Sequence, residues 1–138
     1  ILEMECIFAI VMNTALLSIG TNENREENLS LCHRLLEKEF DYLYYSDTTL
    51  SSPYGSHYKE DFLNQLAIVQ TEKEKDEVAA MLKNIERKIG RKSSDKKGGL
   101  VKIDIDLVIW NEELLKPVDM NRNYIKDLLP SLPDGLLP

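Results

Sequence analysis

The sequence predicts an α+β fold in which two helices cover one face of an antiparallel sheet. Three observations support this: short apolar runs typical of strands, two amphipathic patterns typical of helices, and their order along the chain. That order is strand, helix, strand, strand, helix, strand over residues 15–110. It matches the split βαβ arrangement, which is called ferredoxin-like. We expect all 138 residues to form a single domain.

An apolar run predicts the first strand, and a repeating apolar spacing predicts the first helix. Residues 15–19 predict a short strand, which ends at the polar turn 20–22. The helix after it repeats apolar side chains at spacings of three or four, namely Leu29, Cys32, Leu36 and Phe40. Asn24 and Glu27 are expected to cap its start.

Two further strands follow, separated by a long loop. Residues 42–45 predict the second strand and residues 62–69 the third, while the Ser, Pro and Gly content of residues 48–58 predicts a loop. On the third strand, alternation places four side chains on one face, namely Phe62, Asn64, Leu66 and Ile68. Because a buried amide needs hydrogen-bond partners, Asn64 on this face favours a binding role.

The second helix has the clearest pattern in the chain. Thr71 and Glu74 match a capping box, and Gly90 is suited to end the helix. Between them lies an apolar stripe formed by Val78, Met81, Leu82, Ile85 and Ile89. A polar loop over residues 91–99 then leads to the last strand.

The last strand, residues 101–110, carries the most informative pattern. Its odd positions are apolar and face the predicted core, from Val101 to Ile109, so Lys102, Asp104 and Asp106 share the opposite face. Two carboxylates held two residues apart repel each other unless a cation lies between them. Mg²⁺ prefers one or two carboxylates together with phosphate oxygens. The alternative is a solvated strand face that carries two acids, and the spacing alone does not separate the two.

A local basic run lies upstream of this acid pair. It consists of Arg87, Lys88, Arg91, Lys92, Lys96, Lys97 and Lys102, against the single acid Asp95. A solvated helix end would explain it, but next to an acid pair it favours a phosphate-binding site. A metal and basic side chains around a phosphate chain are what phosphoryl transfer requires.

Composition restricts the partners. A net charge of −7 argues against nucleic acid or an anionic membrane as the main partner. Cys6 and Cys32 have no metal spacing and are expected to be small core residues in a reducing compartment. Glu3 and Glu5 stand where a signal peptide has positive charge, so we expect residues 6–19 to be a buried strand region of a cytoplasmic protein. We expect a monomer or a weak homo-oligomer.

Six segments, taken in order, resemble the hydroxymethyldihydropterin pyrophosphokinase family, whose fold is ferredoxin-like. The resemblance runs from about residue 15 to residue 132, and the segments are residues 18–22, 52–55, 61–64, 85–91, 104–107 and 117–120. It implies transfer of pyrophosphate from ATP to 6-hydroxymethyl-7,8-dihydropterin in folate biosynthesis, with release of AMP. Asp104 and Asp106 would then hold two Mg²⁺ ions against the phosphates.

The resemblance also implies substrate contacts. Phe62 and Tyr124 would stack on the two faces of the pterin, and Asn64 would pair with its edge. One further segment would also pair with the edge of the pterin, namely Ser51, Ser52, Pro53, Tyr54 and Gly55. The residues expected to contact the nucleotide are Glu86, Arg91, Lys97, Lys102 and Arg122. Arg91 and Lys102 would act in catalysis beside the two aspartates.

The chain also departs from the family pattern. Val101 and Lys102 replace an Arg-Thr pair, and the loop 94–99 lacks the usual aromatic and further arginines. The family's histidine near the C-terminus is either replaced by Val118 or lost to a one-residue deletion. Lys102 is the candidate to supply part of the missing charge, although lysine lacks the fixed fork of arginine. Two alternatives therefore stay open. One is a pterin- or nucleotide-binding module that has lost catalysis, and the other is an interaction domain without a small-molecule site.

Overall fold

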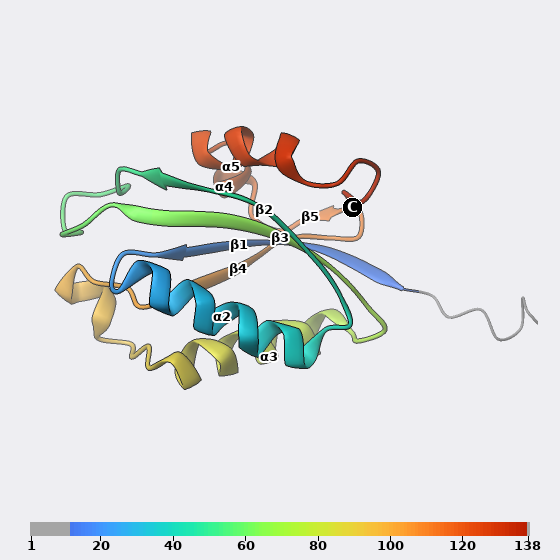
Figure 1. The fold of residues 1–138 in the computed structure, drawn as a ribbon, viewed down its shortest axis with the longest axis horizontal. Helices are drawn as coiled ribbons and strands as arrows, with labels where there is room; N and C mark the ends of the chain where they lie inside the picture. The colour runs from blue at the N-terminus through green and yellow to red at the C-terminus, as the bar shows by residue number, and fades with distance from the viewer. Residues whose placement is uncertain (1–11, 138) are drawn as a thin grey trace, which may run out of the picture.

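An antiparallel sheet of five strands forms the centre of the molecule (Figure 1). The computed structural model describes residues 12–137, so Cys6 and residues 6–11 of the expected strand region lie outside it. The strands, in the spatial order β2-β3-β1-β4-β5, are β1 (Asn13–Thr21), β2 (Tyr42–Ser51), β3 (Phe62–Thr71), β4 (Asp104–Trp110) and β5 (Glu113–Leu114). The helices are α2 (Arg25–Glu39), α3 (Lys75–Ile89), α4 (Pro117–Met120) and α5 (Asn123–Leu128), with the 3₁₀ turns η1 (Asp95–Gly98) and η2 (Leu129–Ser131).

The first face of the sheet is covered by α2 and α3, as the periodicity predicts. Their apolar stripes meet the sheet in one core cluster, to which the helices contribute Leu29, Cys32, Leu36, Val78, Leu82, Ile85 and Ile89. Burial, and after it the charge of Glu86, raises the pKa of the Cys32 thiol to about 12. Cys32 is therefore a core residue, as expected.

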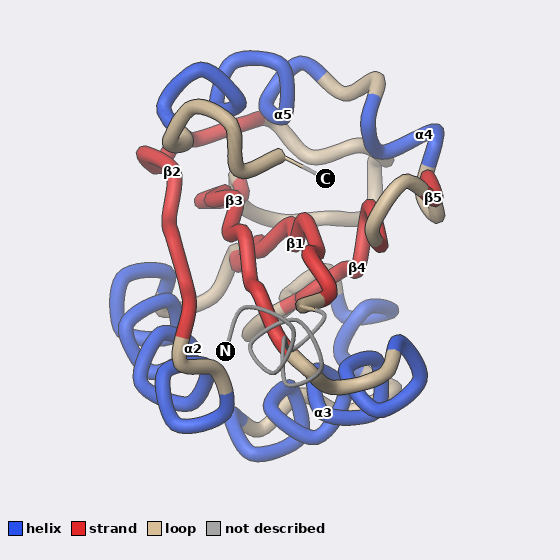
Figure 2. The backbone as a smooth tube through the Cα atoms, turned by 90° about the vertical axis from the view of Figure 1, so that its right-hand side faces the viewer, coloured by secondary structure: helices blue, strands red, loops and turns tan. Residues whose placement is uncertain are grey.

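The second face is also covered, which corrects the expectation that the helices lie on one face only. Figures 1 and 2 show α4 and α5 on the side of the sheet opposite α2 and α3. The contacts form a second core cluster of Leu16, Leu66, Ile68, Val108, Ile125, Leu128 and Leu132. The physical reason is visible in the central strands: residues 15–19 of β1 are all buried, so apolar side chains on both faces need cover.

β2 is longer than expected and reaches Ser51. Its pairing with β3 shifts register between Tyr45 and Thr48 and then continues to Ser51, which pairs with Phe62. The polar composition of residues 48–51 predicted a loop, but main-chain pairing at the sheet edge holds them in a strand.

β4 also departs from strict alternation. Its register against β1 shifts between Leu16 and Leu17. As a result, Val108 and Ile109 both pack on the second cluster, although alternation assigned Ile109 to the helix-covered face. A bulge adds one residue to a strand and so reverses the facing of the residues beyond it.

The expected helix caps are only partly right. Neither α2 nor α3 has a side-chain hydrogen bond at its N-cap, which is Asn24 in one and Glu74 in the other. Thr71 lies in β3 instead, and its hydroxyl accepts a hydrogen bond from the Lys73 amide. Gly90 does end α3, and its φ of 108° is a conformation that glycine adopts without strain. Among residues 12–137, no helix is both long enough and apolar enough to cross a membrane.

The second cluster gives a stability prediction. Ile125 is 0% exposed, whereas Val118 on the neighbouring α4 is 72% exposed. We expect Ile125→Ala to lower the free energy of unfolding by about 2–5 kcal/mol, because it leaves a cavity in the core. Val118→Ala serves as the control and is expected to change it by less than about 0.5 kcal/mol. Urea unfolding measures both, and equal values would mean that α5 does not stabilise the sheet.

Candidate functional site

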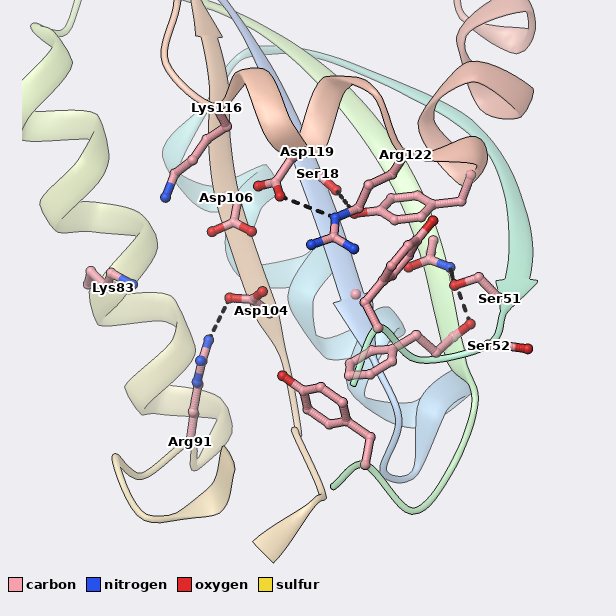
Figure 3. A pocket seen from close by; sticks show the side chains of 16 residues that line it. Ser18, Ser51, Ser52, Lys83, Arg91, Asp104, Asp106, Lys116, Asp119 and Arg122 are labelled. Carbon is pink, nitrogen blue, oxygen red and sulfur yellow. Dashed lines mark hydrogen bonds and ion pairs between the residues drawn. The ribbon is translucent and has the colours of Figure 1, made fainter. Parts of the chain in front are cut away.

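A polar pocket of about 400 Å³ opens over one end of β1, β3 and β4 (Figure 3). Strand register brings its two halves together: Gly20 on β1 pairs with Asn64 on β3 and with Asp104 on β4. Ten of the sequence-predicted residues line the pocket: Ser51, Ser52, Tyr54, Phe62, Asn64, Arg91, Asp104, Asp106, Arg122 and Tyr124. Six further lining residues were not predicted: Ser18, Gly20, Tyr58, Lys83, Lys116 and Asp119.

The carboxylates of Asp104 and Asp106 lie next to each other on β4 at the centre of the pocket. Burial, and then the charges of Asp104 and Asp119, raises the pKa of Asp106 to about 7, while Lys116 opposes the rise. A cation at this position would lower that pKa, because it favours the charged carboxylate. Within residues 12–137, no group of three or more His, Cys, Asp or Glu side chains is placed to hold a metal ion. The two aspartates still suit Mg²⁺, which keeps water and phosphate oxygens as its other ligands.

A buried glutamate holds the arginine that faces this carboxylate pair. Glu86 on α3 is 3% exposed, and its Oε2 accepts hydrogen bonds from Arg91 Nη1 at 3.0 Å and from the Ile105 amide at 2.8 Å. The same Nη1 of Arg91 donates to Asp104 Oδ1 at 2.7 Å. Glu86 does not line the pocket, and its carboxylate holds Arg91 from beneath. Its contact with the nucleotide stays a prediction.

The other end of the pocket is lined by aromatic rings and by the amide of Asn64. Asn64 is buried, and its Nδ2 donates to Ser51 Oγ at 2.7 Å. Gly20 lies beside this amide, and a Cβ at its position would lie 3.5 Å from both Asn64 Oδ1 and the Phe62 ring. Because glycine has no side chain, this space stays open to the pocket. The Tyr58 ring meets the Phe62 ring edge-on, with centroids 5.1 Å apart. This end therefore offers aromatic rings beside a buried amide that can form hydrogen bonds.

The C-terminal segment closes the pocket from the second face of the sheet. Arg122 Nε donates to Asp119 Oδ1 at 3.3 Å, and its guanidinium lies 3.8 Å from the centroid of the Tyr54 ring. Tyr124 Oη lies 3.4 Å from Ser18 Oγ. Figure 3 shows Lys116 and Asp119 on the same side of the carboxylate pair, with Lys83 facing them from α3.

Lys102 does not share the pocket with the aspartates, which corrects the expectation from strand alternation. Its Nζ lies 3.5 Å from Asp95 Oδ2 and 3.8 Å from Glu23 Oε2. Alternation applies within a paired strand, and β4 begins only at Asp104. Lys97 is exposed and does not line the pocket, and Pro53 and Gly55 do not line it either.

A family model described as 7,8-dihydro-6-hydroxymethylpterin-pyrophosphokinase matches residues 16–133. The chain belongs to this family. Membership confirms the resemblance carried by the six sequence segments and supports a pyrophosphokinase role in folate biosynthesis. The family reaction implies ATP and a pterin as substrates. A search of curated proteins found no match.

The position of Glu86 gives a second prediction. We expect Glu86→Gln to lower the free energy of unfolding by about 2 kcal/mol, because hydrogen bonds that a buried charged group makes contribute roughly 1.5–3 kcal/mol. The control is Glu113→Gln, which breaks an ion pair to Lys75 whose partners are both exposed and should cost less than about 1 kcal/mol. Urea unfolding of the two variants compares them directly. A smaller loss in Glu86→Gln than in Glu113→Gln would contradict the positioning role.

Proposed function

We propose that this protein transfers the β,γ-pyrophosphoryl group of ATP to the hydroxyl of 6-hydroxymethyl-7,8-dihydropterin. A bond forms between the hydroxyl oxygen and the β phosphorus, and the hydroxyl proton is released. The bond from that phosphorus to the oxygen of the α phosphate breaks, and AMP leaves with that oxygen. The observation that carries the proposal is that one pocket has two different halves, which join at Gly20. The charged half holds carboxylates and cationic side chains and suits the phosphates. The aromatic half holds aromatic rings and the Asn64 amide and suits the pterin.

Asp104 and Asp106 are the residues that would hold two Mg²⁺ ions. Bound there with ATP, the ions would offset the negative charge that develops on the phosphates. Arg91 is fixed against Asp104 by Glu86, so it adds positive charge on the α3 side of the pocket without needing to reorganise.

We assign the task of offsetting the remaining phosphate charge to Lys83 and Lys116, which line the pocket, in place of Lys102. Lys83 Nζ lies 3.5 Å from Glu86 Oε1, whereas no ion pair of Lys116 is found among residues 12–137. Both lysines and Asp106 also border an adjoining groove of about 260 Å³ between α3 and β4, with Ala79, Leu107 and Leu115 in its wall. We assign the adenine ring to this groove because its wall is mainly apolar.

The pterin is assigned to the aromatic half. Phe62 and Tyr124 would stack on its two faces, and each aromatic partner contributes about 0.5–1.5 kcal/mol beyond area burial. Asn64 would pair with its edge, together with Ser51, Ser52 and Tyr54, the members of the segment 51–55 that line the pocket. Burial, and then the charge of Asp119, raises the pKa of Tyr124, so this ring stays neutral at its place in the pocket.

The proposal also retains the broader expectations from the sequence. We assign the strands β1 to β4 with α2 and α3 to the ferredoxin-like fold and residues 1–138 to one pyrophosphokinase-like domain. We also propose a cytoplasmic protein, a monomer or weak homo-oligomer, that acts on small molecules and not on nucleic acid or membranes. A second candidate is a binding module without catalysis, which the position of Lys102 outside the pocket favours.

An assay for AMP tests the proposal. With ATP, Mg²⁺ and the pterin alcohol, we expect AMP and not ADP to accumulate. Asp104→Asn and Asp106→Asn should each lower the rate by about 10²–10³-fold, as does loss of one group that stabilises transition-state charge. Asp127→Asn is the control, because Asp127 is exposed and does not line the pocket. Thermal stabilisation by the ligands without AMP would instead support the binding module.

The reassignment from Lys102 to Lys116 has its own test. We expect Lys116→Ala to lower kcat/KM for ATP by about tenfold or more, because it removes a charge-assisted contact to phosphate. Lys102→Ala should leave kcat/KM within about twofold, since its ion pairs are partly exposed. Steady-state kinetics of both variants measure this, and the opposite order of effects would return the role to Lys102.

A further inference from the structure

Arg122 is contacted on two sides by residues from different parts of the fold. It lies between α4 and α5, and its Nε donates to Oδ1 of Asp119 on α4 at 3.3 Å. Its guanidinium also lies over the ring of Tyr54, 3.8 Å from the ring centroid. Tyr54 belongs to the loop between β2 and β3, so this contact joins that loop to the C-terminal segment. The negative face of an aromatic ring attracts a cation at this distance.

These two contacts leave most of the hydrogen-bond donors of Arg122 unused. A guanidinium carries five N–H groups in one plane, and the bond to Asp119 uses the one on Nε. Stacking on the Tyr54 ring uses none of them, because it involves the face of the guanidinium and not its edge. Within residues 12–137 no hydrogen bond from Nη1 or Nη2 of Arg122 is found. The side chain points into the pocket, so these donors are available to a ligand there (Figure 3).

The ion pair with Asp119 alone does not fix this arginine. The two side chains are 26% and 22% exposed, and ion pairs that water can reach contribute little. A single bond at Nε also leaves the plane of the guanidinium free to turn about that bond. The Tyr54 ring removes this freedom, because stacking favours a guanidinium plane that lies flat against the ring. Asp119 and Tyr54 together therefore restrict both the position and the plane of the fork.

We propose that Tyr54 is a positioning residue for Arg122, whose guanidinium its ring holds so that the unused Nη donors meet a phosphate of the nucleotide. This rests on the proposed function. It extends the role of Tyr54, which was expected to serve the pterin, to the charged half of the pocket. The ring orients the arginine without occupying a donor, whereas a second carboxylate would occupy one or two. A fork that is already in place loses less side-chain entropy when it binds two phosphate oxygens.

Nuclear magnetic resonance tests the contact without any ligand. Ring currents shift the resonances of protons above a ring face upfield, so we expect upfield resonances for the Nε and Cδ protons of Arg122. Tyr54→Phe keeps the ring and should keep this shift, whereas Tyr54→Leu should remove it. The matched control is Tyr42→Leu, because Tyr42 is 53% exposed, against 50% for Tyr54, and does not line the pocket. Identical Arg122 resonances in Tyr54→Leu and in the wild type would overturn the proposal.

Calorimetry tests the effect on the nucleotide. The probe is the magnesium complex of α,β-methylene ATP, in which carbon replaces the oxygen of the bond that breaks. Tyr54→Leu should raise its Kd about two- to fivefold, as loss of a cation–π contact at an exposed site predicts. Tyr54→Phe should restore most of the affinity, and Tyr42→Leu should not change it. The Kd of the pterin should change less than that of the analogue, whereas general damage to the loop would raise both.

A double-mutant cycle tests whether Tyr54 acts through Arg122. Arg122→Gln removes the charge, so Tyr54→Leu should not raise the Kd of the analogue further in this background. An equal increase in both backgrounds would mean that Tyr54 contacts the nucleotide itself, and it would overturn the positioning role. If Arg122→Gln binds too weakly to be measured, the comparison of Tyr54→Leu with Tyr54→Phe and Tyr42→Leu decides.

The remaining outcomes separate this proposal from the one on which it rests. Equal Kd values for the analogue in the wild type, Tyr54→Phe and Tyr54→Leu overturn the positioning role and leave the proposed function intact. Equal losses in Tyr54→Phe and Tyr54→Leu also overturn it, because the ring is then not what matters. If the wild-type protein binds neither the analogue nor the pterin, the proposed function fails, and the positioning role fails with it.

Discussion

The repulsion between the neighbouring carboxylates of Asp104 and Asp106 is the constraint around which this site is built. Two acids on one strand face cannot both be charged in a half-buried pocket without compensation, and the raised pKa of Asp106 expresses that cost. Arg91 supplies one compensating charge and is itself held by the buried Glu86. Because Glu86 also accepts a hydrogen bond from the Ile105 amide, the same carboxylate fixes α3 to β4. One buried side chain thus both holds the helix on the sheet and places a positive charge in the pocket.

The C-terminal segment serves the core and the pocket at once. Ile125 and Leu128 bury the second face of the sheet, while Asp119, Arg122 and Tyr124 from the same short stretch line the pocket. The site therefore depends on apolar packing several residues away from its chemistry. In a pyrophosphokinase this arrangement makes physical sense, because a rigid base positions the charged groups before the substrates bind.

The sequence allowed much of the site to be predicted where the pattern is local. Asp104 and Asp106 share a face because they are two residues apart in one strand, and Phe62 and Asn64 share a face for the same reason. Gly90 ends α3 for an equally local reason, because its φ of 108° does not continue a helix and glycine adopts it without strain. The elements after β4 could not be predicted in this way, since β5, α4 and α5 are too short to give a periodic signal.

Spacing along single elements is therefore enough to predict the order of the main strands and helices, the acid pair, and the pair formed by Phe62 and Asn64. Which lysine faces the acids depends instead on how the elements pack together. Lys102 is near them in sequence but pairs with Asp95, whereas Lys116, ten residues beyond Asp106, lines the pocket. Only the tertiary structure brings Asn22 to Glu60 and Gly99. Long side chains and buried amides contact residues that are distant in the sequence, and a local periodicity cannot predict such contacts.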